Sequence, residues 1–489
     1  MLNNLKNELN YTTTENGAVT HETSRSHLLD FFALAGAMRN RSEQDIMQLF
    51  SKAFAENPLY AMKALFYMRD IREGNGERRL FRVCTKWLAT NAPQVLIKNL
   101  PHIAEYGRWD DLIALIDTSV SKEVLFIIRQ QWNNDVFGCS VGKPVSLLAK
   151  WMPSENASSP TTKRLAKIIA KDLNYTMRNY RKTLSLLRNH LSILESKMSA
   201  KQWDEINYST VPSQAMLKYR SAFYRNDEER YAAYLSALKS PVTRDVVKIN
   251  TKTLYPYQLV EKVLFTNGTA EENDLYNVMW ENLPDTVGDN YQNSIAVVDV
   301  SASMYGQPIT VAVSLGLYIA EKNKGKFHNH FITFSSNPSL VEVVGTNFTE
   351  KVRNITKAQW CMNTDLKKTF DLILNTAIKY QLPQSEMPAT LYIISDMQFD
   401  GACRGNKETL FQTMKKEFAQ HGYELPRVVF WNVDARHNQV PVVKNEPNVQ
   451  LVSGFSHNVF TSLMEQKEYS PFEYMIDVLS SERYEVITD

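Results

Sequence analysis

The first part of the chain carries the apolar spacing of packed helices. Apolar residues recur at three- and four-residue steps in segments such as SHLLDFFALAGAM (26–38), QDIMQLFSKAFAENPLYAMKALFYM (44–68) and LLRNHLSILESKM (186–198). Proline or glycine interrupts this pattern at short intervals, which divides it into helices of ordinary length. Periodic helices separated by short breaks are typical of stacked helical hairpins. We therefore predict an N-terminal tail over 1–24 and an α-helical solenoid or ring over 25–270.

The pattern changes near residue 286, where short apolar runs begin to alternate with amphipathic segments. Strands are expected near 294–299, 328–334, 389–395, 426–433 and 449–453, and helices near 308–323, 364–380, 407–421, 457–466 and 471–483. Alternating strands and helices predict a doubly wound, mostly parallel α/β sheet, which binds ligands at the carboxyl ends of its strands. This assigns a linker to 271–292 and an α/β domain to 293–489.

Composition narrows the class of protein. Hydrophobic residues make up 44% and charged residues 22% of the 489 positions, which is typical of a soluble globular protein. The polar start, MLNNLKNELN, lacks the plan of a signal peptide, so a cytoplasmic protein is expected. Residues 1–280 hold 37 Lys and Arg against 29 Asp and Glu, whereas residues 281–489 hold 18 against 24. A basic first part joined to an acidic second part favours an anionic partner for the first.

One segment carries specific chemistry. Ser294–Met304 reads SIAVVDVSASM, an apolar strand that ends on Asp299 and is followed by Ser301 and Ser303. Further on, Thr364 precedes an amphipathic helix, and the apolar strand TLYIISD ends on Asp396. Carboxylates and hydroxyls at the ends of parallel strands can form a hard-cation site from oxygen ligands alone. The same residues could instead cap helices and turns, and that alternative remains open at this point.

The order and element types of these residues resemble the metal-ion-dependent adhesion site of von Willebrand factor A domains. The resemblance implies that Ser301, Ser303 and Thr364 ligate Mg²⁺ directly, while Asp299 and Asp396 act through water. Hydroxyl ligands leave the ion underneutralised, so it takes a carboxylate or phosphate oxygen from outside. The pattern departs from the family before Thr364, where Met362 and Asn363 stand in place of glycines. No general base or nucleophile stands nearby in the sequence, so a docking site rather than an enzyme is expected.

Helical repeats followed by an A domain resemble the TROVE architecture (Telomerase, Ro and Vault proteins), in which HEAT-like helices precede such a domain. IREGNGERRLF (71–81) and YGRWDDLIAL (106–115) are similar to landmarks of that group. They are more similar still to an uncharacterised family of plants, giant viruses and phages, as are LLAKWMPS (147–154), VPSQAM (211–216) and GFSHNVF (454–460). Proteins of the Ro type bind structured and misfolded RNA, so the resemblance implies an RNA-binding scaffold.

Two basic clusters fit that implication. Between 143 and 201 twelve basic residues face three acidic ones, and Lys163, Lys167 and Lys171 step by four along one helix face that can follow a phosphate backbone. The nucleic-acid-binding candidates are Lys163, Lys167, Lys171, Arg178, Arg181, Lys182, Arg72, Arg78 and Arg79. Tyr175 and Tyr180 lie among them as candidates for base stacking. A solvated helix face is the plain alternative.

Three functions follow. The function that the sequence favours first is that of an RNA-binding ribonucleoprotein scaffold. A protein–protein adaptor, in which the metal site captures an acidic residue of an assembly or ATPase-associated factor, is the alternative. A metal-dependent hydrolase is disfavoured, because one hydroxyl-rich Mg²⁺ site lacks the clustered carboxylates of two-metal chemistry.

Overall fold

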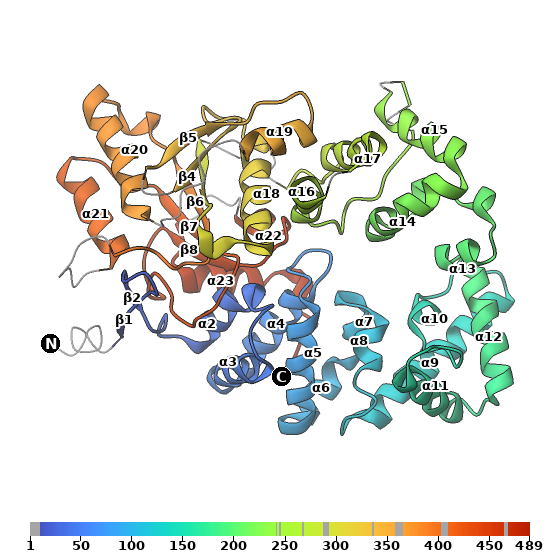
Figure 1. The fold of residues 1–489 in the computed structure, drawn as a ribbon. Coiled ribbons are helices and arrows are strands. Elements are labelled where there is room, and N and C mark those ends of the chain that lie inside the picture. Colours follow the sequence, from blue (N-terminus) through green and yellow to red (C-terminus); the bar gives the residue numbers. More distant parts are fainter. Residues whose placement is uncertain are drawn as a thin grey trace. The chain divides into compact units, whose positions relative to one another are not determined.

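The computed structural model describes residues 10–240, 242–243, 246–266, 268–286, 293–334, 337–356, 365–401, 409–463 and 468–489 (Figure 1). The chain forms two compact units. The sheet unit contains the chain up to Met68, Arg72–Asn75 and Thr251–Glu485, and the helical unit contains Arg69–Ile71, Gly76–Asn250 and Val486–Asp489. Among the described residues, none of the helices has the length and apolarity needed to span a membrane.

A six-stranded sheet organises the sheet unit. Its strands are β3 (Ser294–Asp299), β4 (His330–Phe334), β5 (Ser339–Glu342), β6 (Thr390–Ser395), β7 (Arg427–Asn432) and β8 (Val449–Ser453). Their order is β5-β4-β3-β6-β7-β8, and every pair is parallel except β4 with β5. The chain builds outward from β3 on one side and from β6 on the other, so the strand order reverses between these two central strands. A ligand site is expected at their carboxyl ends.

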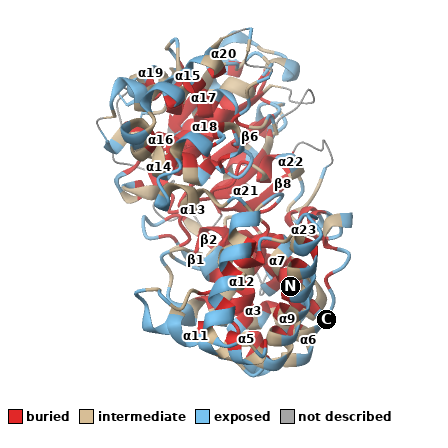
Figure 2. Cartoon of the chain, turned by 90° about the vertical axis from the view of Figure 1, so that its right-hand side faces the viewer, coloured by how far each residue is buried: buried red, intermediate tan, exposed pale blue. Residues whose placement is uncertain are grey.

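This sheet confirms the predicted α/β pattern for the second part of the chain. The five predicted strands are present. The edge strand β5 is an addition, because it is only four residues long and mostly exposed and so has no clear apolar pattern. Figure 2 shows buried residues along β6 and along α18 (Gln307–Lys322). A methyl group on Gly316 of α18 would come within 2.4 Å of Val298 Cγ2 in β3, so glycine permits the helix to lie close on the sheet.

Helices complete the sheet unit. They are α2 (His27–Leu34), α3 (Glu43–Glu56), α4 (Pro58–Arg69), α16 (Pro256–Phe265), α17 (Ala270–Glu281), α18, α19 (Phe348–Ile355), α20 (Leu366–Tyr380), α21 (Leu410–Gln420), α22 (Val459–Leu463) and α23 (Pro471–Leu479). The compact units therefore differ from the predicted domains. Helices α2, α3, α4 and α16 were expected in the solenoid but belong to the sheet unit, and α17 fills half of the segment expected to be a linker.

The expected N-terminal tail contains a β-hairpin. Strands β1 (Tyr11–Thr13) and β2 (Val19–His21) pair in antiparallel fashion. Its turn is fixed to the loop that follows β6: Thr14 Oγ1 donates to Phe399 O at 2.6 Å, and Asn16 Nδ2 donates to Gln398 O at 2.7 Å. The hairpin therefore belongs to the structure around the carboxyl end of the central strands, not to a free tail.

Asn75, in the middle of the Gly74-Asn75-Gly76 sequence, has a packing role in the sheet unit. Asn75 is buried, and its carbonyl accepts a hydrogen bond from the Tyr255 hydroxyl at 2.9 Å. A methyl group on Gly454, just after β8, would come within 2.0 Å of Asn75 Oδ1, and Gly454 has φ +111°. Only glycine fits such a backbone at such a distance. The landmarks GNG and GFSHNVF thus meet in the fold.

The helical unit contains helices and irregular connections in its described part. Its helices are α5 (Arg78–Asn91), α6 (Pro93–Asn99), α7 (Ile103–Tyr106), α8 (Trp109–Ile113), α9 (Ser121–Ser140), α10 (Leu148–Trp151), α11 (Pro160–Asp172), α12 (Met177–His190), α13 (Leu194–Ser199), α14 (Ser213–Asn226) and α15 (Glu228–Lys239). Neighbours along the chain pack on one another, as α10, α11 and α12 do against α9. Short 3₁₀ turns lie between several of them.

A buried ion cluster lies inside this unit. Asp111 is fully buried, and its Oδ2 accepts from Arg69 Nε at 2.9 Å and from Arg69 Nη2 at 2.6 Å. Its Oδ1 accepts from Arg82 Nε at 2.7 Å. A methyl group on Gly107 would lie 2.6 Å from Asp111 Oδ2, so glycine leaves room for the pair. The landmark YGRWDDLIAL supplies Asp111 and Gly107, while Arg69 and Arg82 stand on either side of the landmark IREGNGERRLF.

Candidate metal centre

The sheet brings four of the five predicted metal residues together. Asp299 ends β3, and Asp396 directly follows β6, the strand paired with β3. Ser301 N–H donates to Asp299 Oδ1 at 2.9 Å, and the hydroxyls of Ser301 and Ser303 are 2.9 Å apart. The fifth residue, Thr364, lies outside the described residues.

Hydrogen bonds from neighbouring residues orient the carboxylates of Asp299 and Asp396. Ser395, the last residue of β6, donates through Oγ to Asp299 Oδ2 at 2.6 Å. Gln398 N–H donates to Asp396 Oδ1 at 3.1 Å. Ser395 therefore links the two strands at their ends, a contact that no motif in the sequence indicates. It holds the Asp299 carboxylate in one orientation.

The electrostatics of the site are unfavourable without a cation. Asp299 and Asp396 are both fully buried. Burial, and next the charge of Asp396, raises the pKa of Asp299 to about 7. Burial raises the pKa of Asp396 as well, against hydrogen bonds from Gln398 and Ser303 and the charge of Arg436. Two buried carboxylates at one place repel each other, and a bound cation relieves that repulsion.

A cation that the sequence analysis missed stands beside the carboxylates. Arg436, in the loop after β7, places Nη2 3.2 Å from Asp396 Oδ2 and donates through the same nitrogen to Ser303 O. Its Nε donates to Asp434 Oδ2 at 3.0 Å. Asp396 Oδ2 is buried and accepts no well-formed hydrogen bond. No pattern marks an arginine in this loop as part of the site, because only the parallel register of β6 and β7 brings it there.

The donor set fits Mg²⁺. Two carboxylates and two hydroxyls are hard oxygen donors, and Asp396 Oδ2 is a buried oxygen without a well-formed hydrogen bond. Within the described ranges there is no cluster of three or more His, Cys, Asp or Glu side chains suited to a metal ion. A metal ion at this place would therefore depend on the two serine hydroxyls together with the two carboxylates.

The first basic cluster is exposed, but not all of it is unpaired. Lys163, Lys167 and Lys171 on α11 are exposed, as are Arg178 and Lys182 around α12. For these five residues no ion pair is found among the described side chains. Arg181, also exposed, lies 3.3 Å from Glu155 Oε2.

Of the two aromatic residues expected among these cations, Tyr180 offers no stacking surface. Tyr180 is fully buried, donates to Pro153 O at 2.7 Å and stacks on Trp132 with 5.7 Å between ring centroids. Tyr175 makes an edge contact with the same tryptophan. The prediction that Tyr180 stacks on bases is wrong, because it lies on the core side of α12, one residue before the exposed Arg181.

The second basic cluster is divided and partly neutralised. Arg72 belongs to the sheet unit, whereas Arg78 and Arg79 begin α5 in the helical unit. All three are exposed. Arg78 lies 3.8 Å from Asp110, a carboxylate that also accepts from Arg82 at 2.7 Å. Asp110, 32 positions further along the chain, thus offsets part of the charge of Arg78.

Comparisons with known proteins place the chain in a family. A family model described as a domain of unknown function, DUF2828, matches residues 14–136 and 138–292, and a second, DUF7788, also described as a domain of unknown function, matches residues 293–485. The chain belongs to the DUF2828 family. It is 33% identical over 508 residues to an uncharacterised protein of Acanthamoeba polyphaga mimivirus, an alignment that covers 96% of this chain and 87% of the relative. The two family models meet at 292/293, where the sequence pattern changes from helical to alternating.

Proposed function

We propose that this protein is a divalent-cation-dependent binding protein whose sheet unit captures an acidic group of a partner protein. The observation that carries the proposal is the convergence of Asp299, Ser301, Ser303 and Asp396 at the point where the strand order reverses. This convergence supports the proposal of an adhesion-type site in a von Willebrand factor A-like domain.

The chain's own residues define what the site does. Ser301 and Ser303 would hold Mg²⁺ directly, together with Thr364, and Asp299 and Asp396 would hold it through water. The bound ion would supply a positive charge that is not fully neutralised and therefore attracts an external carboxylate. Ser395 and the Gln398 N–H fix the two carboxylates, so the site is organised before a partner arrives.

Binding of the partner protein is expected to require the divalent cation. Natively purified protein in Mg²⁺ should retain a protein partner that EDTA releases, since chelation removes the charge that binds the partner's carboxylate. The readout is mass spectrometry of the EDTA eluate. A matched purification of Asp299→Asn should yield no such eluate. A partner that stays bound in EDTA, or is released equally from the variant, would contradict the proposal.

A second function, RNA binding by the helical unit, is favoured by one observation. Five exposed cations on α11 and α12 lack acidic partners in the described chain, namely Lys163, Lys167, Lys171, Arg178 and Lys182. Lysines spaced by four along a helix follow a phosphate backbone, and each phosphate contact releases counterions. In this account, the helical unit is a solenoid of the TROVE type.

The RNA prediction concerns affinity and its salt dependence. Changing Lys163, Lys167, Lys171 and Arg178 to Glu should weaken binding of a hairpin RNA with a single-stranded tail by at least a hundredfold, and should reduce the slope of log K against log salt by about 3 or more. Fluorescence anisotropy at several salt concentrations measures both. Charge reversal of Lys218, Lys239, Lys248 and Lys262 is the control for net charge, and equal losses in both variants would remove this surface from the account.

A further inference from the structure

The guanidinium of Arg436 lies against the residues of the candidate metal centre. It contacts Asp396, Asp434 and the backbone of Ser303 at once. Asp396 and Ser303 are two of the groups assigned to the cation, so Arg436 uses part of the same ligand set. About a third of its side chain remains exposed, which leaves it free to change partners.

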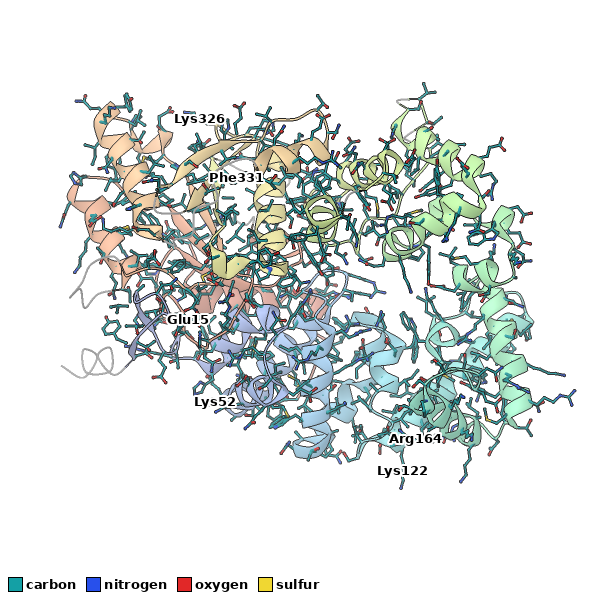
Figure 3. The ribbon with its side chains drawn as sticks, in the orientation of Figure 1. Glu15, Lys52, Lys122, Arg164, Lys326 and Phe331 are labelled. Atoms are coloured by element: carbon teal, nitrogen blue, oxygen red, sulfur yellow. The ribbon has the colours of Figure 1, made fainter. Side chains whose placement is uncertain are left out.

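A second acidic group holds Arg436 from the other side. Glu15, in the turn between β1 and β2 (labelled in Figure 3), places Oε2 3.8 Å from Arg436 Nη1. Its Oε1 lies 2.6 Å from His437 Nε2. The Glu15 N–H donates to Gln398 Oε1 at 3.0 Å, which ties the turn to the loop that Asp396 begins. Glu15 and Asp434 therefore offer Arg436 carboxylates outside the metal site.

We propose that Arg436 is a tethered cation that competes with the divalent ion for Asp396, and that Glu15 of the N-terminal hairpin draws it away when the ion binds. The inference rests on the proposed metal site and adds its regulation. A guanidinium and Mg²⁺ near one carboxylate repel each other, so each weakens the binding of the other. Asp434 and Glu15 reduce the repulsion between the guanidinium and the metal ion, because their carboxylates can pair with Arg436 after it leaves Asp396.

The test is a calorimetric titration of Mn²⁺ into the full-length protein and its variants. Arg436→Gln should bind Mn²⁺ roughly tenfold more tightly than the wild type, because a fixed positive charge beside the ion is gone. Arg436→Lys keeps the charge and should stay within about threefold of the wild type. Lys415→Gln removes an exposed charge that pairs with Glu446 and should have no effect.

Glu15→Gln tests the role of the hairpin. It should weaken Mn²⁺ binding by about threefold in the wild type and change nothing in the Arg436→Gln background, because Glu15 acts only through Arg436. Circular dichroism of each variant reports folding independently of the metal.

The outcomes separate this inference from the metal site itself. If neither the wild type nor Arg436→Gln binds Mn²⁺, the proposed metal site is wrong. If the wild type binds and Arg436→Gln binds equally or more weakly, the competition is overturned and Arg436 instead supports Asp396. If Glu15→Gln weakens Mn²⁺ binding equally in both backgrounds, Glu15 does not act through Arg436, and the role proposed for the hairpin is wrong.

Discussion

Asp111→Ala is expected to destabilise the helical unit by about 3–5 kcal/mol, the usual cost of removing one member of a buried ion pair. Asp111 is completely buried between Arg69 and Arg82 and accepts three charge-assisted hydrogen bonds. Removing it leaves Arg69, itself 2% exposed, without its buried counter-ion. The loss is large because a buried charge cannot recover its hydration in the folded state.

The measurement is hydrogen exchange of the α5 and α8 amides in the full chain, since a two-unit protein has no single unfolding transition. Exchange there should accelerate strongly, while β6 amides in the sheet unit keep their protection. Asp117→Ala is the matched control: its pair with Arg164 is exposed, so a change of at most about 1 kcal/mol is expected. Equal effects of the two substitutions would show that the buried ion cluster stabilises the helical unit no more than an exposed ion pair does.

Asp299→Asn is expected to abolish Mg²⁺-dependent stabilisation while leaving the metal-free sheet unit as stable as before, or more stable. Asparagine retains the shape of the side chain and an acceptor for Ser301 N–H. It removes one of two mutually repelling buried charges, which offsets the loss of the acceptor for Ser395 Oγ in the apo protein. In the wild type, Mg²⁺ at one hundred times its dissociation constant should add about 2.7 kcal/mol.

Thermal unfolding with and without Mg²⁺ measures this difference. In the wild type, the unfolding transition of the sheet unit should move to higher temperature with Mg²⁺ and return on addition of EDTA. The variant should melt at one temperature throughout. Ser395→Ala, which removes the bond to Asp299 Oδ2 and the acceptor for the Met397 N–H, should give an intermediate response. If the Asp299→Asn variant is still stabilised against heat by Mg²⁺, the stabilisation does not require the Asp299 carboxylate and the prediction is wrong.

The strand endings could be predicted from sequence because the information is local. A buried apolar run followed by Asp299, and another followed by Asp396, define strands whose carboxyl ends must meet if the strands pair. The same local pattern identified the exposed lysines of α11. These features need only the period of a helix or strand and the type of the residue that ends it.

The contacts between distant segments could not be predicted. Thr14 bonds to Phe399 across 385 positions, and Arg436 reaches Asp396 only through strand register. The neutralisation of Arg82 by Asp110 and Asp111 likewise depends on tertiary packing. Tyr180 was misassigned because one step along a helix separates a core position from an exposed one. Long-range pairing leaves no periodic signal in the chain.

The most direct test of the central claim is the stoichiometry of Mn²⁺ binding to purified full-length protein, by equilibrium titration monitored through the paramagnetic resonance of the free ion. We predict one ion per chain in the wild type, displaced by Mg²⁺, and none at the same concentrations in Asp299→Asn. A wild-type protein that leaves all Mn²⁺ free, or a variant that binds one ion as tightly as the wild type, would contradict the assignment of a cation site to Asp299, Ser301, Ser303 and Asp396.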